Sequence, residues 1–230
     1  MADRDDLAVR GIPIARIIGA TGLVGTLLLF ATLIGASPGE PAINATTAEA
    51  ATYVRGLDTT WVRLAEAGSD IAMFVLLWFM VGLALLLRRV DGEIPVRSTM
   101  ALVSAVLVAA FVILEVGDAA GANHAADLDP GQLAYAYDLS HLGFANAWLA
   151  MAGFAFACGW IIAATRVMPR WLGRWGVISG IALAPAQFVW TIEGAWLLPY
   201  VAFWLWLITT AVLLTRRRGF VLPEKLADGT

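Results

Sequence analysis

Long apolar stretches alternate with short polar ones along this chain, and the alternation predicts its architecture. A helix needs about 20 consecutive apolar residues to cross the roughly 30 Å of hydrocarbon in a bilayer. Stretches of this kind cover residues 14–36, 68–87, 98–118, 142–165, 174–192 and 195–215. The sequence therefore predicts an all-α fold, in which residues 1–230 form a single transmembrane domain, a bundle of six membrane-spanning helices.

Basic residues are distributed unevenly between the segments that join these stretches. Of the 15 lysines and arginines, 13 lie at the two termini or around the connections after the second and fourth stretches. Arg55 and Arg63, the other two, follow the first stretch. Because positive charge gathers in cytoplasmic loops, we predict that both termini are cytoplasmic and that the remaining connections face outward.

Composition agrees with a membrane location. Hydrophobic residues make up 60% of the 230 positions and charged residues only 14%, against about 25% charged in soluble domains. The mean hydropathy is +0.77, so the bilayer is the expected partner. The net charge of −3 includes no basic patch for nucleic acid. Lys225 is the one lysine among many arginines, a bias typical of GC-rich bacterial genomes, which points to the cytoplasmic (inner) membrane of a bacterium.

The outer connection after the first stretch has helical periodicity of its own. Thr46 and Glu49 match the capping box S/T-x-x-E that begins many helices. Apolar residues then recur at helical spacing with charged residues between them, namely Tyr53, Leu57, Trp61 and Leu64. We predict an amphipathic surface helix over residues 46–66. Such a helix either forms a lid on its own bundle or contacts a partner protein.

Acidic residues gather at the outer end of the predicted bundle. Counting about 1.5 Å per residue from the cytoplasmic arginines places five carboxylates in one layer on four helices. They are Asp70, Glu115, Asp118, Asp138 and Glu193. Asp70 and Asp138 stand where the second and fourth helices are expected to begin, so N-capping explains both. Glu193 can begin the last helix in the same way.

Glu115 and Asp118 do not fit that explanation, because the third helix is expected to end there and its dipole disfavours negative charge. A carboxylate inside an apolar run is costly unless it is paired or hydrated, which makes Glu115 a functional candidate. Its expected partners are His141, Asn146 or Gln187.

Two short spacings place polar pairs on one helix face: Glu115 with Asp118, and Asp138 with His141. Together they resemble half of a carboxylate–histidine metal site, with His141, Glu115 and Asp138 as candidate ligands. Helix capping and contacts between helices explain the same residues without a metal. The sequence specifies neither a cofactor nor an oligomeric state.

These residues predict an outer-facing polar cavity that binds a small ligand or a cation. Its candidate lining is Glu115, Asp118, Asp138, His141, Asn146, Gln187 and Glu193. One alternative is a membrane enzyme that acts on a lipid or prenyl substrate by metal or acid–base catalysis. Another is a small-molecule transporter with Asn146 and Gln187 along its path.

Two passages resemble a known family. They are "LLWFMVGLALLLRRVDGEIP" at residues 76–95 and "AATRVMPRWLGRWGVISGIAL" at residues 163–183. The chain is similar to the bacterial six-helix membrane proteins grouped as domain of unknown function 4386. The resemblance implies a fold and a location, but no activity and no functional residues.

Overall fold

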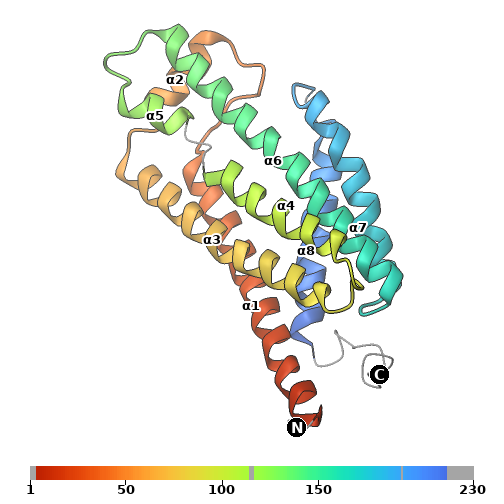
Figure 1. Cartoon of the computed structure of the whole chain (residues 1–230). Helices are drawn as coiled ribbons and strands as arrows, with labels where there is room; N and C mark the ends of the chain where they lie inside the picture. The colour runs from red at the N-terminus through yellow and green to blue at the C-terminus, as the bar shows by residue number, and fades with distance from the viewer. Residues whose placement is uncertain (1–3, 114–116, 193, 217–230) are drawn as a thin grey trace.

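The computed structural model describes residues 4–113, 117–192 and 194–216, and this part of the chain is built from helices (Figure 1). In chain order they are α1 (Arg4–Ala36), α2 (Thr47–Gly56), α3 (Thr60–Arg88), α4 (Val96–Ile113), α5 (Gly117–Asn123), α6 (Pro130–Thr165), α7 (Arg170–Leu183), the 3₁₀ helix η1 (Ala184–Val189) and α8 (Leu197–Thr215).

Five segments are long and apolar enough to cross a membrane. They are Ile14–Ala36, Thr60–Arg88, Val96–Asn123, Pro130–Thr165 and Leu197–Thr215. The all-helical architecture with several membrane-length helices is thus as the sequence predicts, and it indicates a multi-pass membrane protein.

The remaining predicted stretch, 174–192, is divided in the structure. The α-helix α7 stops at Leu183 after 14 residues, and the 3₁₀ helix η1 continues for 6 more. Pro185 explains the change, because proline lacks an N–H and its ring clashes with the carbonyl four residues earlier. At about 1.5 Å per residue in α7 and about 2.0 Å in η1, the two together extend about 33 Å.

The long helices form a closed ring in chain order. Each of α1, α3, α4, α6, α7 and α8 packs on the next, and α8 closes the ring against α1. The α3–α4 and α6–α7 connections and the end of α8 lie at one end of the bundle, and the first turns of α1 extend past that end (Figure 1). We call this the arginine end. The opposite end, which carries α2 and α5, we call the cap end.

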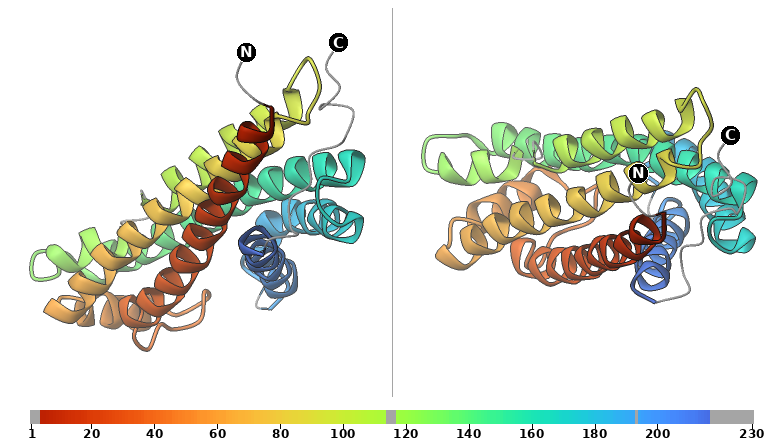
Figure 2. Two further views of the ribbon diagram at one scale, coloured as in Figure 1. Left: turned by 90° about the horizontal axis from the view of Figure 1, so that it is seen from below. Right: turned by 60° about the horizontal axis from the view of Figure 1, so that its bottom comes forward.

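Two hydrophobic cores follow one another along the bundle. The larger core fills the ring of long helices. The smaller core lies at the cap end, between α2, α5 and the first turns of α3 and α6; it consists of Ala50, Ala51, Val54, Leu57, Val62, Ala122, Leu133 and Tyr137. We call this assembly the cap. Figure 2 shows it at one end of the long helices.

The predicted surface helix over 46–66 is wrong in its extent. The capping box of Thr46 and Glu49 is confirmed, and the hydrogen bond from the Thr46 backbone to the carboxylate lowers the pKa of Glu49. However, α2 ends at Gly56, and residues 60–66 are the first turns of α3. Leu57 is buried in the cap whereas Trp61 is 67% exposed, so the two halves face different surroundings. Within the chain, α2 packs as a lid on α5 and α6.

The expected N-caps are also wrong. Asp70 lies within α3 and Asp138 within α6, whereas Thr59 and Asp129 cap these helices. Asp129 forms a complete capping box with Gln132. Both helices begin earlier than the apolar pattern predicts. Their first turns precede the apolar stretches and are stabilised by packing in the cap.

Glycines bring the backbones of α6 and α7 into direct contact. A Cβ atom at Gly159 would lie 2.6 Å from the Val177 nitrogen, and one at Gly180 would lie 2.6 Å from the Ala152 oxygen. Gly173 faces the α6 backbone in the same way, whereas Gly176 lies against the Trp206 side chain of α8 as well as the Ala155 oxygen of α6. Small residues permit this close approach, which is how helices pack in membranes without a hydrophobic effect between them.

A single methyl group at this contact is expected to destabilise the bundle. Gly180→Ala should lower the free energy of unfolding by about 1–3 kcal/mol, because backbone atoms of α6 would have to move. Thermal melting in detergent, followed by circular dichroism, measures the effect. Gly56→Ala is the matched control, since no atom lies within 4 Å of its added Cβ; equal midpoints for the two variants would contradict the prediction.

Candidate functional site

Polar side chains from four segments meet at the cap end, on the outer part of α6. We call Glu40, Tyr53, Asp118, Tyr137, Ser140 and His141 the outer polar cluster. His141 lies at its centre, with Nε2 3.0 Å from Glu40 Oε1 and Nδ1 3.0 Å from the backbone oxygen of Tyr137. Both ring nitrogens therefore face acceptors, an arrangement that the doubly protonated imidazolium satisfies and a neutral ring does not.

Aromatic rings continue the outer polar cluster from α6 to α2. The Tyr137 ring lies 4.2 Å from that of His141 and 5.7 Å from that of Tyr53, measured between centroids. The Tyr137 hydroxyl donates to the backbone oxygen of Pro41 at 2.8 Å. Together with the Glu40–His141 pair, this bond fastens the loop of residues 37–46 to α6. Burial and the charge of Glu40 raise the pKa of Tyr53, so this phenol stays neutral.

Asp118 forms hydrogen bonds with a residue of α6. It lies in α5, and residues 114–116, which stand between α4 and α5, are outside the described residues. Ser140 Oγ donates to Asp118 Oδ1 at 2.7 Å and accepts from the Asp118 backbone nitrogen at 3.1 Å. Asp118 therefore joins α5 to α6, and its expected position at the end of a spanning helix stays a prediction.

Asn146 and Gln187, both named from the sequence as candidate lining residues, form a hydrogen bond with each other between helices. Gln187 Nε2 donates to Asn146 Oδ1 at 2.8 Å. The bond joins the middle of α6 to η1, just past the point where α7 gives way to a 3₁₀ helix. It supplies a polar contact close to the position where the backbone hydrogen bonding changes from α-helical to 3₁₀.

The predicted metal site is not assembled by the residues that the structure describes. Within residues 4–113, 117–192 and 194–216, no group of three or more His, Cys, Asp and Glu side chains is placed to hold a metal ion. His141 is paired with Glu40, and Asp138 is not part of that pair. Glu115 and Glu193, the other acidic candidates, lie outside the described residues.

Sequence reasoning did not assign four members of the cluster to a site: Glu40, Tyr53, Tyr137 and Ser140. Glu40 sits in the segment "SPGEP", which has no periodicity to indicate which way its side chain faces. Ser140 had a detectable signal, because Leu133, Tyr137 and Ser140 recur at helical spacing and all three are buried. A polar residue on a buried helix face needs a partner, and here the partner is Asp118.

A groove of about 370 Å³ opens beside the outer polar cluster. Three segments line it: the loop before α2, the outer part of α6 and the turn after η1. The lining residues are Ile43, Asn44, Tyr135, Asp138, Leu139, Leu142, Trp190 and Thr191. Asp138 is exposed and has neither an ion pair nor a hydrogen bond with any described residue. The groove thus combines a free carboxylate with two aromatic rings and an apolar wall.

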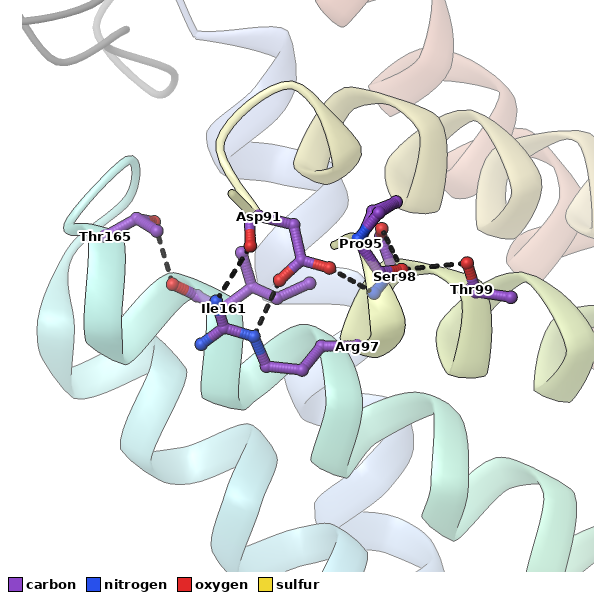
Figure 3. Close-up of polar contacts among 7 residues, drawn as sticks. All are labelled: Asp91, Pro95, Arg97, Ser98, Thr99, Ile161 and Thr165. Carbon is purple, nitrogen blue, oxygen red and sulfur yellow. Dashed lines mark hydrogen bonds and ion pairs between the residues drawn. The ribbon is translucent and has the colours of Figure 1, made fainter. Parts of the chain in front are cut away.

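A second polar cluster lies at the arginine end, where Figure 3 shows Asp91 of the α3–α4 loop bonded to Arg97 and Ser98 of α4. Asp91 is buried and accepts from Arg97 Nε at 2.6 Å and from the Ser98 backbone nitrogen at 2.8 Å. The Arg97 guanidinium also lies 5.4 Å from the centre of the Trp160 ring on α6. Because these groups satisfy one another, the cluster is a structural joint rather than a site for a ligand.

No family model matches the chain, and neither the curated proteins nor the solved structures include one that is significantly similar to it. The resemblance to the family of domain of unknown function 4386 therefore stays a prediction. The geometry described above is the evidence on which a function can be proposed.

The contact between His141 and Glu40 gives a direct test of the cluster. A double-mutant cycle with His141→Ala and Glu40→Ala should yield a coupling of about 1 kcal/mol in thermal unfolding, since the pair is partly exposed. Hydrogen exchange of residues 37–46 should rise in both single variants as the loop loosens.

His124→Ala is the matched control, because His124 is exposed and its side chain forms neither a hydrogen bond nor an ion pair with any described residue. If His124→Ala loosens the loop as much as His141→Ala does, the anchoring role of His141 is refuted.

Proposed function

We propose that the chain is a six-pass protein of a bacterial cytoplasmic membrane, with both termini in the cytoplasm, and that its outer end binds a small ligand. The combined length of α7 and η1, about 33 Å, supports a sixth crossing, since the hydrocarbon is roughly 30 Å thick. The placement of Arg88, Arg97, Arg166 and Arg170 at one end supports the orientation, because positive charge marks the cytoplasmic side.

Cysteine labelling tests this topology. The native cysteine, Cys158, is fully buried, so the wild-type protein should not react with the maleimide and serves as the negative control. In intact cells, a membrane-impermeant maleimide should label Asp127→Cys in the α5–α6 connection. Glu93→Cys in the α3–α4 connection should react only after lysis. Labelling of Glu93→Cys in intact cells would contradict the proposed orientation.

The groove beside Asp138 is the observation that carries the ligand-binding role. Binding sites for small molecules are concave, mostly apolar and equipped with a few polar groups that fix orientation. The groove has this composition, and the groups that line it come from three segments far apart in the sequence. The Asp138 carboxylate carries a negative charge that no described residue neutralises. A bound cationic ligand would neutralise it.

Binding is favoured over acid–base catalysis by the contacts of the neighbouring groups. Both nitrogens of His141 are occupied by acceptors, and the Ser140 hydroxyl is bonded to Asp118. His141 therefore does not bond to Ser140, whereas a nucleophilic pair requires a hydrogen bond between the base and the nucleophile. A membrane enzyme is accordingly the weaker alternative.

A transporter receives little support from the core. Among the described residues, the buried polar side chains are Thr26, Asp91, Ser98, Ser140, Ser179 and Thr210. The threonine hydroxyls bond to their own helices, and Asp91 lies at the arginine end. No polar path is visible in this part of the chain from Asn146 and Gln187 to the arginine end.

Filling the groove should abolish binding. In detergent, the wild-type melting temperature is measured with ethanolamine, choline, spermidine, calcium chloride and short-chain phospholipids. At least one class should raise the midpoint by mass action, and Leu142→Trp should remove the rise. Leu85→Trp is the control, because Leu85 is similarly exposed on α3, away from the groove. A panel without any effect on the wild type would refute the ligand-binding role.

A further inference from the structure

We propose that the occupant of the groove is a phospholipid with a primary-ammonium headgroup, held by the Asp138 carboxylate; this rests on the ligand-binding role proposed above. Three features of the groove support this choice: its charge, its hydrogen-bond acceptors and its position on the bundle.

The charge of the groove selects a cation. Asp138 is its one ionisable acid, and neither lysine, arginine nor histidine lines it. An anionic headgroup would meet a carboxylate without a compensating base. The rings of Tyr135 and Trp190 line the same groove, and aromatic faces attract cations by about 0.5–1 kcal/mol at exposed sites.

The oxygens around Asp138 favour a primary ammonium over a quaternary one. A primary ammonium carries three N–H donors. The carboxylate of Asp138, the amide oxygen of Asn44 and the hydroxyl of Thr191 supply three acceptors in the same groove, and none of these side chains bonds to another described residue. A quaternary ammonium has no donor and would leave the acceptors without a bond.

The position of the groove favours a lipid over a soluble amine. Leu139 and Leu142 line it, and Leu149 continues the same face of α6 toward the middle of the bundle. These side chains are 47%, 42% and 54% exposed. Phe188 on the adjoining η1 is 84% exposed. A headgroup beside Asp138 would thus have an apolar track below it for its acyl chains.

The wall that faces α6 is held in place before any ligand binds. Ile43 and Asn44 belong to the loop that His141 and Tyr137 fasten to α6. A preformed wall reduces the ordering that binding requires. The outer polar cluster therefore acts as a support for the groove and does not itself contact the headgroup.

Native mass spectrometry of the full chain in detergent tests the assignment. The probes are phosphatidylethanolamine, phosphatidylcholine and phosphatidylglycerol with identical acyl chains, and free ethanolamine. We expect the wild type to prefer phosphatidylethanolamine. Asp138→Asn should weaken that binding about tenfold or more, the loss expected for a hydrogen bond to a charged group, and should remove the preference. Thr191→Val, which deletes one acceptor, should weaken binding less.

Asp127→Asn is the matched control, an exposed acid outside the groove that should leave binding unchanged. Thermal melting of each variant verifies that it is folded. The lipid assignment would be overturned if phosphatidylcholine or free ethanolamine bound as well as phosphatidylethanolamine, or if phosphatidylglycerol bound better. If such a probe still depended on Asp138, the ligand-binding role would stand. If no probe bound, both proposals would be refuted.

Discussion

The direct backbone contact between α6 and α7 is the constraint on which the rest of the bundle depends. Gly159 and Gly180 leave no room for a side chain at this contact, so the two helices are fixed in register as well as in distance. Because α6 also packs on α2, α4, α5 and η1, fixing it sets the positions of most other elements. Dispersion and close packing, rather than exclusion of water, hold such contacts together within a bilayer.

The length of α6 explains why the protein has a cap. Its 36 residues extend about 54 Å, against roughly 30 Å of hydrocarbon, so a little under half of the helix projects beyond the hydrocarbon. An isolated helix of that size in water is marginally stable. The small core contributed by α2 and α5 buries one face of the projection, and Asp129 closes its first turn.

The two polar clusters and the groove differ in how completely their groups are satisfied. At the arginine end, Asp91 accepts hydrogen bonds from Arg97 and from the Ser98 backbone and so joins α4 to its preceding loop. In the outer polar cluster, His141 fastens a loop by two bonds. The groove contains the exception, Asp138, which has no described partner. Completed networks hold a structure together, whereas a charge that stays open beside aromatic rings is available to a ligand.

The sequence by itself determined the features that depend on local periodicity and composition. These are the long apolar helices and the Thr46–Glu49 capping box. The sequence misplaced the first residues of α3 and α6. Hydropathy identifies the part of a helix that contacts lipid, whereas the first turns of these two helices lie in the cap.

Only the tertiary structure decided which distant groups meet. The Tyr137 hydroxyl reaches the backbone of Pro41 across 96 positions, and Glu40 reaches His141 from an aperiodic loop. The free carboxylate of Asp138 becomes part of a groove because η1 and that loop both lie against α6. Periodicity specifies which face of a helix is buried, but the packing of several helices selects the partner that each face meets.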